Sequence, residues 1–67
     1  MEDFYYLEYS LANEERVLLR FSDINQRDGC YISLDMYKAQ LGPVTLDVLN
    51  NICKKFSGER MDGRLEL

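Results

Sequence analysis

The sequence lacks histidine and tryptophan, and its 67 residues include one proline and two cysteines. Without histidine there is no Ser-His-Asp or Cys-His catalytic pair, no imidazole ligand for zinc and no side chain that switches charge near neutral pH. Two cysteines are too few for a four-thiolate metal site, and no run approaches the roughly 20 apolar residues of a membrane-spanning helix. We therefore expect a protein that is not an enzyme, binds no metal or cofactor and does not enter a membrane.

The length limits the chain to one small domain over residues 1–67. A domain of about 60 residues buries only about 60% of the surface that its unfolded chain exposes, so an oligomer or a partner is expected to support it. The acidic start, Met1-Glu2-Asp3-Phe4, differs from a signal or transit peptide and predicts a cytoplasmic protein. In that compartment the thiols of Cys30 and Cys53 stay reduced. The pattern places both in the core without deciding whether they touch.

Negative charge is concentrated at the N-terminal end. The chain has 12 acidic and 8 basic residues, a net charge of −4. Residues 1–15 contribute −5 (five acidic, no basic) and residues 16–67 contribute +1 (seven acidic, eight basic). This distribution argues against nucleic acid as the main partner, because phosphate binding draws its affinity from Lys and Arg. It predicts an acidic patch formed by Glu2, Asp3, Glu14 and Glu15.

Two segments near the N-terminus alternate between apolar and polar residues, which predicts strands at residues 4–11 and 16–22. The polar residues 12–15 predict the turn between them, with a helix over residues 11–18 as the alternative. Residues 30–37 alternate in the same way and predict a third strand, whose apolar face is Cys30, Ile32, Leu34 and Met36. A polar loop that ends in the turn dipeptide Asp28-Gly29 is expected before this third strand.

The register of the first hairpin follows from its apolar faces, because directly opposed residues lie on the same face of a sheet. We expect Leu11 opposite Val17. The same register places Glu8 opposite Arg20, a favourable pair of opposite charges. The agreement between apolar and charged pairs favours an antiparallel meander.

After residue 44 the period changes from two to about 3.6, which predicts a helix over residues 46–57. Thr45 is the expected N-cap and Gly58 the expected left-handed stop. The apolar face of this helix is Leu46, Leu49, Ile52, Cys53 and Phe56. The tail, residues 59–67, contains a candidate fourth strand at residues 64–67. The predicted fold is α+β, a three-stranded antiparallel β-meander packed on one α-helix.

One helix covers only one face of such a sheet. The uncovered face then carries aromatic, apolar and arginine side chains, types that are enriched in the hot spots of protein interfaces. An exposed aromatic patch on a small domain indicates a binding surface, although strands also carry tyrosine on ordinary solvent faces. The predicted partner-binding residues are Phe4, Tyr6, Glu8, Leu18, Arg20, Tyr31 and Tyr37.

These observations predict a non-enzymatic protein-binding module, an inhibitor or adaptor that occupies a partner surface. If the partner handles nucleic acid, the acidic N-terminal segment would compete for its basic groove. The chain resembles, in composition and without a shared motif, small phage and mobile-element proteins that block a host factor. Two alternatives are a homodimeric structural or regulatory protein, and a weak binder of single-stranded nucleic acid that stacks bases on the aromatic residues.

Overall fold

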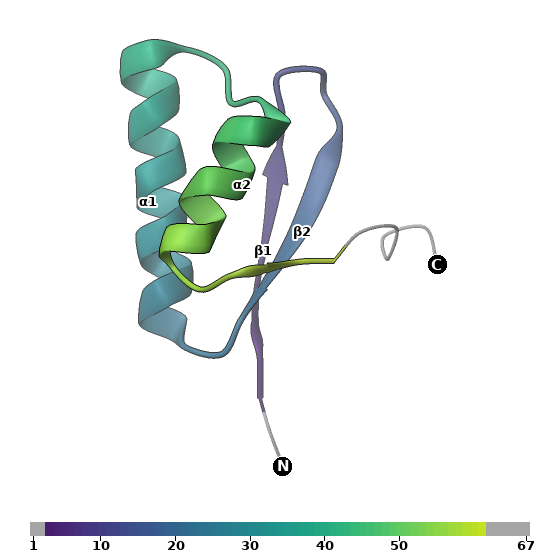
Figure 1. Cartoon of the computed structure of the whole chain (residues 1–67), viewed down its shortest axis with the longest axis vertical. Coiled ribbons are helices and arrows are strands. Elements are labelled where there is room, and N and C mark those ends of the chain that lie inside the picture. The colour runs from purple at the N-terminus through teal and green to yellow at the C-terminus, as the bar shows by residue number, and fades with distance from the viewer. Residues whose placement is uncertain (1–2, 62–67) are drawn as a thin grey trace.

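The computed structural model describes residues 3–61, and within that range it forms five elements. In chain order they are β1 (Tyr5–Ser10), β2 (Arg16–Phe21), α1 (Ile24–Leu41), α2 (Leu46–Lys55) and β3 (Glu59–Arg60). The three described strands form an antiparallel sheet in the order β1-β2-β3. Figure 1 shows α1 and α2 side by side against this sheet. The predicted α+β fold, in which a three-stranded antiparallel sheet packs against helical structure, is confirmed.

The β1–β2 hairpin confirms the first two predicted strands and their turn. Its register is shifted by two residues from the predicted one, because Tyr9, and not Leu11, lies opposite Val17. The physical reason is a tighter turn, in which the Leu11 amide donates to the carbonyl of Glu15 at 2.8 Å and Glu14 has φ 71°. The hairpin loop therefore has three residues, 12–14, whereas the predicted register leaves five, 12–16, between Leu11 and Val17.

The prediction of a third strand at residues 30–37 is wrong, because this segment lies inside the 18-residue helix α1. In a helix, residues two positions apart lie on different sides, whereas in a strand they share a face. Cys30 and Leu34 are fully buried, whereas Ile32 and Met36 are 56% and 53% exposed. The fold therefore has a second helix where the meander was expected to continue, and its third strand comes from β3 instead.

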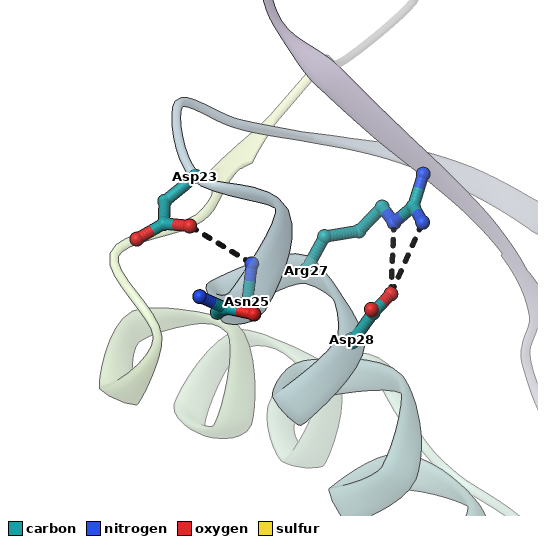
Figure 2. Close-up of polar contacts among 4 residues, drawn as sticks. All are labelled: Asp23, Asn25, Arg27 and Asp28. Carbon is teal, nitrogen blue, oxygen red and sulfur yellow. Dashed lines mark hydrogen bonds and ion pairs between the residues drawn. The ribbon is translucent and has the colours of Figure 1, made fainter.

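The start of α1 carries a capping signal that alternation concealed. Asp23 is the N-cap, and its Oδ1 accepts a hydrogen bond from the amide of Asn25 at 2.8 Å (Figure 2). Gln26 stands three residues later, the spacing of a capping box. The next residue, Arg27, donates to the carboxylate of Asp28 (Figure 2). The expected loop over residues 23–29 is therefore the helix N-cap and first turns.

Gly29 shows why an apparent turn signal stands inside α1. A Cβ built at this position would lie 2.7 Å from Cε1 of Phe56, a residue that directly follows α2. The glycine thus lets the aromatic ring approach the backbone of α1. Its role is close packing, which sequence spacing alone does not distinguish from a turn.

Helix α2 confirms the predicted helix in residues 46–57, with its last residue at Lys55. Thr45 is the N-cap as predicted, and its Oγ1 accepts from the amide of Val48 at 3.4 Å. The expected left-handed stop at Gly58 is wrong, because Ser57 is the residue with positive φ, 59°. The candidate strand at residues 64–67 lies outside the described residues.

The core lies between the helices and one face of the sheet. Tyr9, Leu19 and Phe21 contribute from the strands, and Leu34 and Leu49 contribute from α1 and α2. Because side chains alternate along a strand, the even-numbered residues of β1 and β2 lie on the opposite, outer face. Neither helix within residues 3–61 has the length and apolar character of a membrane span.

Candidate functional site

The outer face of the sheet brings together five of the seven predicted partner-binding residues. Tyr6 and Glu8 alternate with core residues on β1, and Leu18 and Arg20 do the same on β2, with Phe4 just before β1. Tyr6 lies directly opposite Arg20 and is 48% exposed. Among the described elements, α1 and α2 pack on the other face, so this patch faces away from the core.

Arg20 contacts both an aromatic ring and a carboxylate on the outer face. Its guanidinium carbon lies 4.4 Å from the centroid of the Phe4 ring, a cation–π geometry. Its Nε donates to Oε1 of Glu59 at 3.1 Å, which links β2 to β3. This hydrogen bond raises the pKa of Arg20. The charge is thus held between an aromatic ring and a carboxylate, and the Phe4 ring is covered in turn.

Glu8 binds a different arginine from the one predicted. Its Oε2 accepts from Nη1 of Arg16 at 3.3 Å, and both side chains are largely exposed. The two-residue shift in register explains the change, since Leu18 now stands opposite Glu8. An exposed pair of this kind contributes little to stability.

Tyr31 and Tyr37 do not lie on the outer face of the sheet, and their predicted placement there is wrong. Both belong to α1. Tyr31 is 46% exposed on this helix, and Tyr37 is partly buried against the core. The outer face therefore carries two described aromatic residues, Phe4 and Tyr6, which is a small platform for stacking nucleic-acid bases.

The predicted acidic residues are divided between the two ends of β1. Asp3 precedes the strand, and Glu14 and Glu15 lie in the turn beyond it, all exposed. A strand of this length spans about 20 Å at about 3.4 Å per residue. β1 thus separates Asp3 from Glu14 and Glu15, which were predicted to form one acidic patch. Glu2 lies outside the described residues.

A groove between α1 and α2 forms a second surface that the sequence pattern did not predict. Its volume is about 470 Å³, and Lys55 is the one basic residue among those that line it. The apolar and aromatic lining residues are Met36, Tyr37, Leu41, Val48, Ile52 and Phe56. The signal was present in the sequence, because Ser33, Met36, Tyr37, Gln40 and Leu41 recur at helical spacing. Strand alternation over the same residues concealed it.

Leu41 and Met36 make the groove unusually apolar for an open surface. Leu41 is 72% exposed and Met36 is 53% exposed, and Ile32, one turn before Met36, is 56% exposed. Contiguous exposed apolar patches on small domains mark binding sites. The groove can therefore accept an apolar surface, and Lys55 adds one positive charge at its edge.

The two cysteines are buried and unbridged. Burial, with a smaller contribution from nearby Cys53, raises the pKa of Cys30 to about 12. Burial also raises the pKa of Cys53. Because the thiolate is the nucleophile and metal ligand, such protonated thiols are inert packing groups. No cluster of three or more metal-ligating side chains occurs among residues 3–61.

None of the family models, curated proteins or solved structures compared with the chain matches it. The outer face of the sheet and the α1–α2 groove differ in character. The outer face is polar and aromatic, whereas the groove is mainly apolar.

Proposed function

We propose that the chain is a non-enzymatic protein-binding module, an inhibitor or adaptor that works in the cytoplasm by occupying the surface of another protein. The observation that carries the proposal is the exposure of Met36 and Leu41 in the groove between α1 and α2. Leaving such side chains in water is unfavourable by about 25 cal/mol per Å² of apolar surface. A partner that covers them recovers this free energy on binding.

The groove suits an amphipathic helix of the partner. It runs between two helices, and an added helix would pack its apolar residues against Met36, Ile52 and Phe56. Lys55 lines the same groove, and Lys54 precedes it in the last turn of α2. Charge complementarity therefore favours an acidic residue on the flank of the docked helix.

The outer face of the sheet is the second contact region of the proposed module. Tyr6 offers an exposed aromatic ring beside the ordered guanidinium of Arg20. Asp3, Glu8 and the turn residues Glu14 and Glu15 give this hairpin a negative charge. If the partner binds nucleic acid, the hairpin would compete for its basic groove, and affinity would then fall as salt is raised.

Site-specific photocrosslinking in the cell of origin tests the proposal. A benzoylphenylalanine placed at Met36 reports on the groove, and one placed at Tyr6 reports on the outer face. Asn50 is the matched control, because it is exposed on α2 and does not line the groove. We expect a discrete heterologous adduct at Met36 that an excess of unmodified chain abolishes.

Each outcome of this experiment is informative. An adduct at Tyr6 alone would move the binding surface from the groove to the sheet. Equal labelling at Met36, Tyr6 and Asn50 would contradict the proposal. An adduct of twice the 7.9 kDa mass of the chain reports self-association and is scored separately.

A further inference from the structure

β1 is an edge strand, and directly beyond it the amide of Ala12 donates to the carbonyl of Val44 at 2.8 Å, so the loop before α2 covers that end of the edge. Within the described residues β1 pairs with β2 alone, so its other edge has no neighbouring strand (purple in Figure 1). Natural sheets protect such edges with charged side chains, lysine above all, with proline or a bulge, with a very short strand, or with a helix or loop that covers them. Glu8 is the one charged residue of β1. β1 is six residues long, contains neither lysine nor proline and keeps an unbroken register with β2. It therefore has the properties of a strand that pairs with another chain.

The hydrogen-bonding groups on the open edge can be assigned from the turn. The amide of Leu11 donates to the carbonyl of Glu15, so the backbone groups of Leu11 face β2. In an antiparallel ladder the backbone groups of successive residues point to opposite edges of the strand. Those of Tyr9, Leu7 and Tyr5 therefore also face β2. The intervening residues, Tyr6, Glu8 and Ser10, direct their N–H and C=O groups to the open edge. The carbonyl of Leu18 confirms the alternation, since it accepts from Met61 on the β3 side.

We infer that the open edge of β1 pairs with β1 of a second copy of the chain, antiparallel and about a twofold axis. The twofold places Leu7 opposite Leu7 of the other copy. Tyr5 then faces Tyr9 on the core side, and Tyr6 faces Glu8 on the outer side. This pairing does not depend on the proposed groove, and it makes one continuous sheet across the two copies.

Three observations select this register. Residues opposed across a ladder share a face, so the twofold must pass through a residue and not between two. Centring it on Glu8 would oppose two carboxylates, and centring it on Tyr6 would pair fewer residues of β1. Centring it on Leu7 makes Tyr6 and Glu8 a hydrogen-bonded pair, and these are residues whose backbone groups face the edge.

Helix α1 lies over the core side of β1. The hydroxyl of Tyr9 donates to the carbonyl of Leu34 at 3.5 Å, so α1 lies over β1. Burial, followed by the nearby Asp35 and Tyr31, raises the pKa of Tyr9. Tyr31 is 46% exposed.

Light scattering on a sizing column tests the pairing at low and high loading. We expect the mass to rise toward twice 7.9 kDa as loading increases. Glu8→Pro removes an amide of the open edge and no hydrogen bond to β2, so it should keep the chain at monomer mass. Glu8→Ala is the matched control, because it loses the same carboxylate and keeps the amide. A wild-type monomer at every loading, or a Glu8→Pro dimer, would overturn the inference.

Amide hydrogen exchange on the unmodified chain covers the case in which Glu8→Pro does not fold. Exchange at Tyr6 and Glu8 should slow at high loading, because pairing gives these amides a partner. Leu7 and Tyr9 are internal controls, since their amides face β2 at every loading. A dimer in which Tyr6 and Glu8 still exchange freely would place the interface elsewhere and refute the pairing of β1.

Discussion

Gly58 lies so close to Phe21 that a Cβ at position 58 would come within 2.5 Å of Cε2 of the ring. The same Cβ would lie 2.6 Å from Sγ of Cys53. Phe21 is 1% exposed and Cys53 is 4% exposed, so neither side chain has free space to move into. The amide of Gly58 also donates to the carbonyl of Cys53 at 2.9 Å. The glycine thus fixes how closely the chain passes the core on its way from α2 to β3.

We expect Gly58→Ala to lower the free energy of unfolding by about 1–3 kcal/mol, the usual range for overpacking a core. Urea denaturation followed by circular dichroism measures the loss. The same substitution in a Phe21→Leu background should cost less, because the smaller side chain leaves room for the methyl group. Equal costs in the two backgrounds would show that Gly58 is not in steric conflict with the ring.

Leu34 and Ile32 provide a direct test of helix α1 against a strand. Leu34→Ala should cost about 2–5 kcal/mol of stability, because it removes a fully buried side chain. Ile32→Ser should change stability by no more than about 0.5 kcal/mol, because Ile32 is 56% exposed. Both are measured by urea denaturation. A strand would bury the two residues together, and similar large losses would then contradict the helix.

The two helix N-caps differ in geometry, and their substitutions should differ accordingly. Asp23 accepts from Asn25 at 2.8 Å, whereas Thr45 accepts from Val48 at 3.4 Å. Asp23→Ala should lower the thermal midpoint, at a cost of about 1 kcal/mol, and Thr45→Ala should cost less. Asp23→Asn keeps an acceptor and serves as the control. A larger effect at Thr45 would contradict this order.

The buried thiols predict a loss of stability at alkaline pH. Burial raises the pKa of Cys30 to about 12, whereas a thiol in the unfolded chain has a pKa of about 8.5. The unfolded chain therefore loses its proton first. Stability is complete below about pH 8.5 and falls above it, by about 1.4 kcal/mol per pH unit for each such thiol.

Urea denaturation between about pH 7.5 and 9.5 measures this slope, below the usual range of tyrosine titration. The variant with Cys30→Ala and Cys53→Ala is the control. It loses some stability to the cavities that it creates, but its dependence on pH should be flatter. An unfolding free energy in the original chain that stays constant across this range would contradict burial of the thiols.

The hairpin and α2 could be predicted because their signals are local. Residues of β1 and β2 alternate with period two, and a polar turn joins them, so strand and face follow without knowledge of the rest. The apolar spacing after Thr45 similarly fixes the buried side of α2. The register was the exception, since one left-handed residue, Glu14, shortened the loop and moved every opposed pair by two residues.

The identity of α1 could not be settled by pattern, because its residues satisfy two periods. Cys30, Ile32, Leu34 and Met36 alternate as in a strand, and Cys30 and Leu34 also stand one helical turn apart. The dipeptide Asp28-Gly29 is also typical of a turn before a strand, so it favoured the strand over the helix. Only the tertiary fold resolves this, because Phe56 needs Gly29 for close approach and Leu34 packs into the shared core.

By itself, the sequence determined the fold class, the first hairpin, α2 and the buried face of the strands, since each rests on interactions between near neighbours. The tertiary structure decided the rest. It placed Tyr31 and Tyr37 on α1, opened the groove lined by Met36 and, among residues 3–61, left one edge of β1 without a neighbouring strand. The physical reason is that these surfaces are made between elements, and an ambiguous segment takes whichever structure buries its apolar side chains against the others.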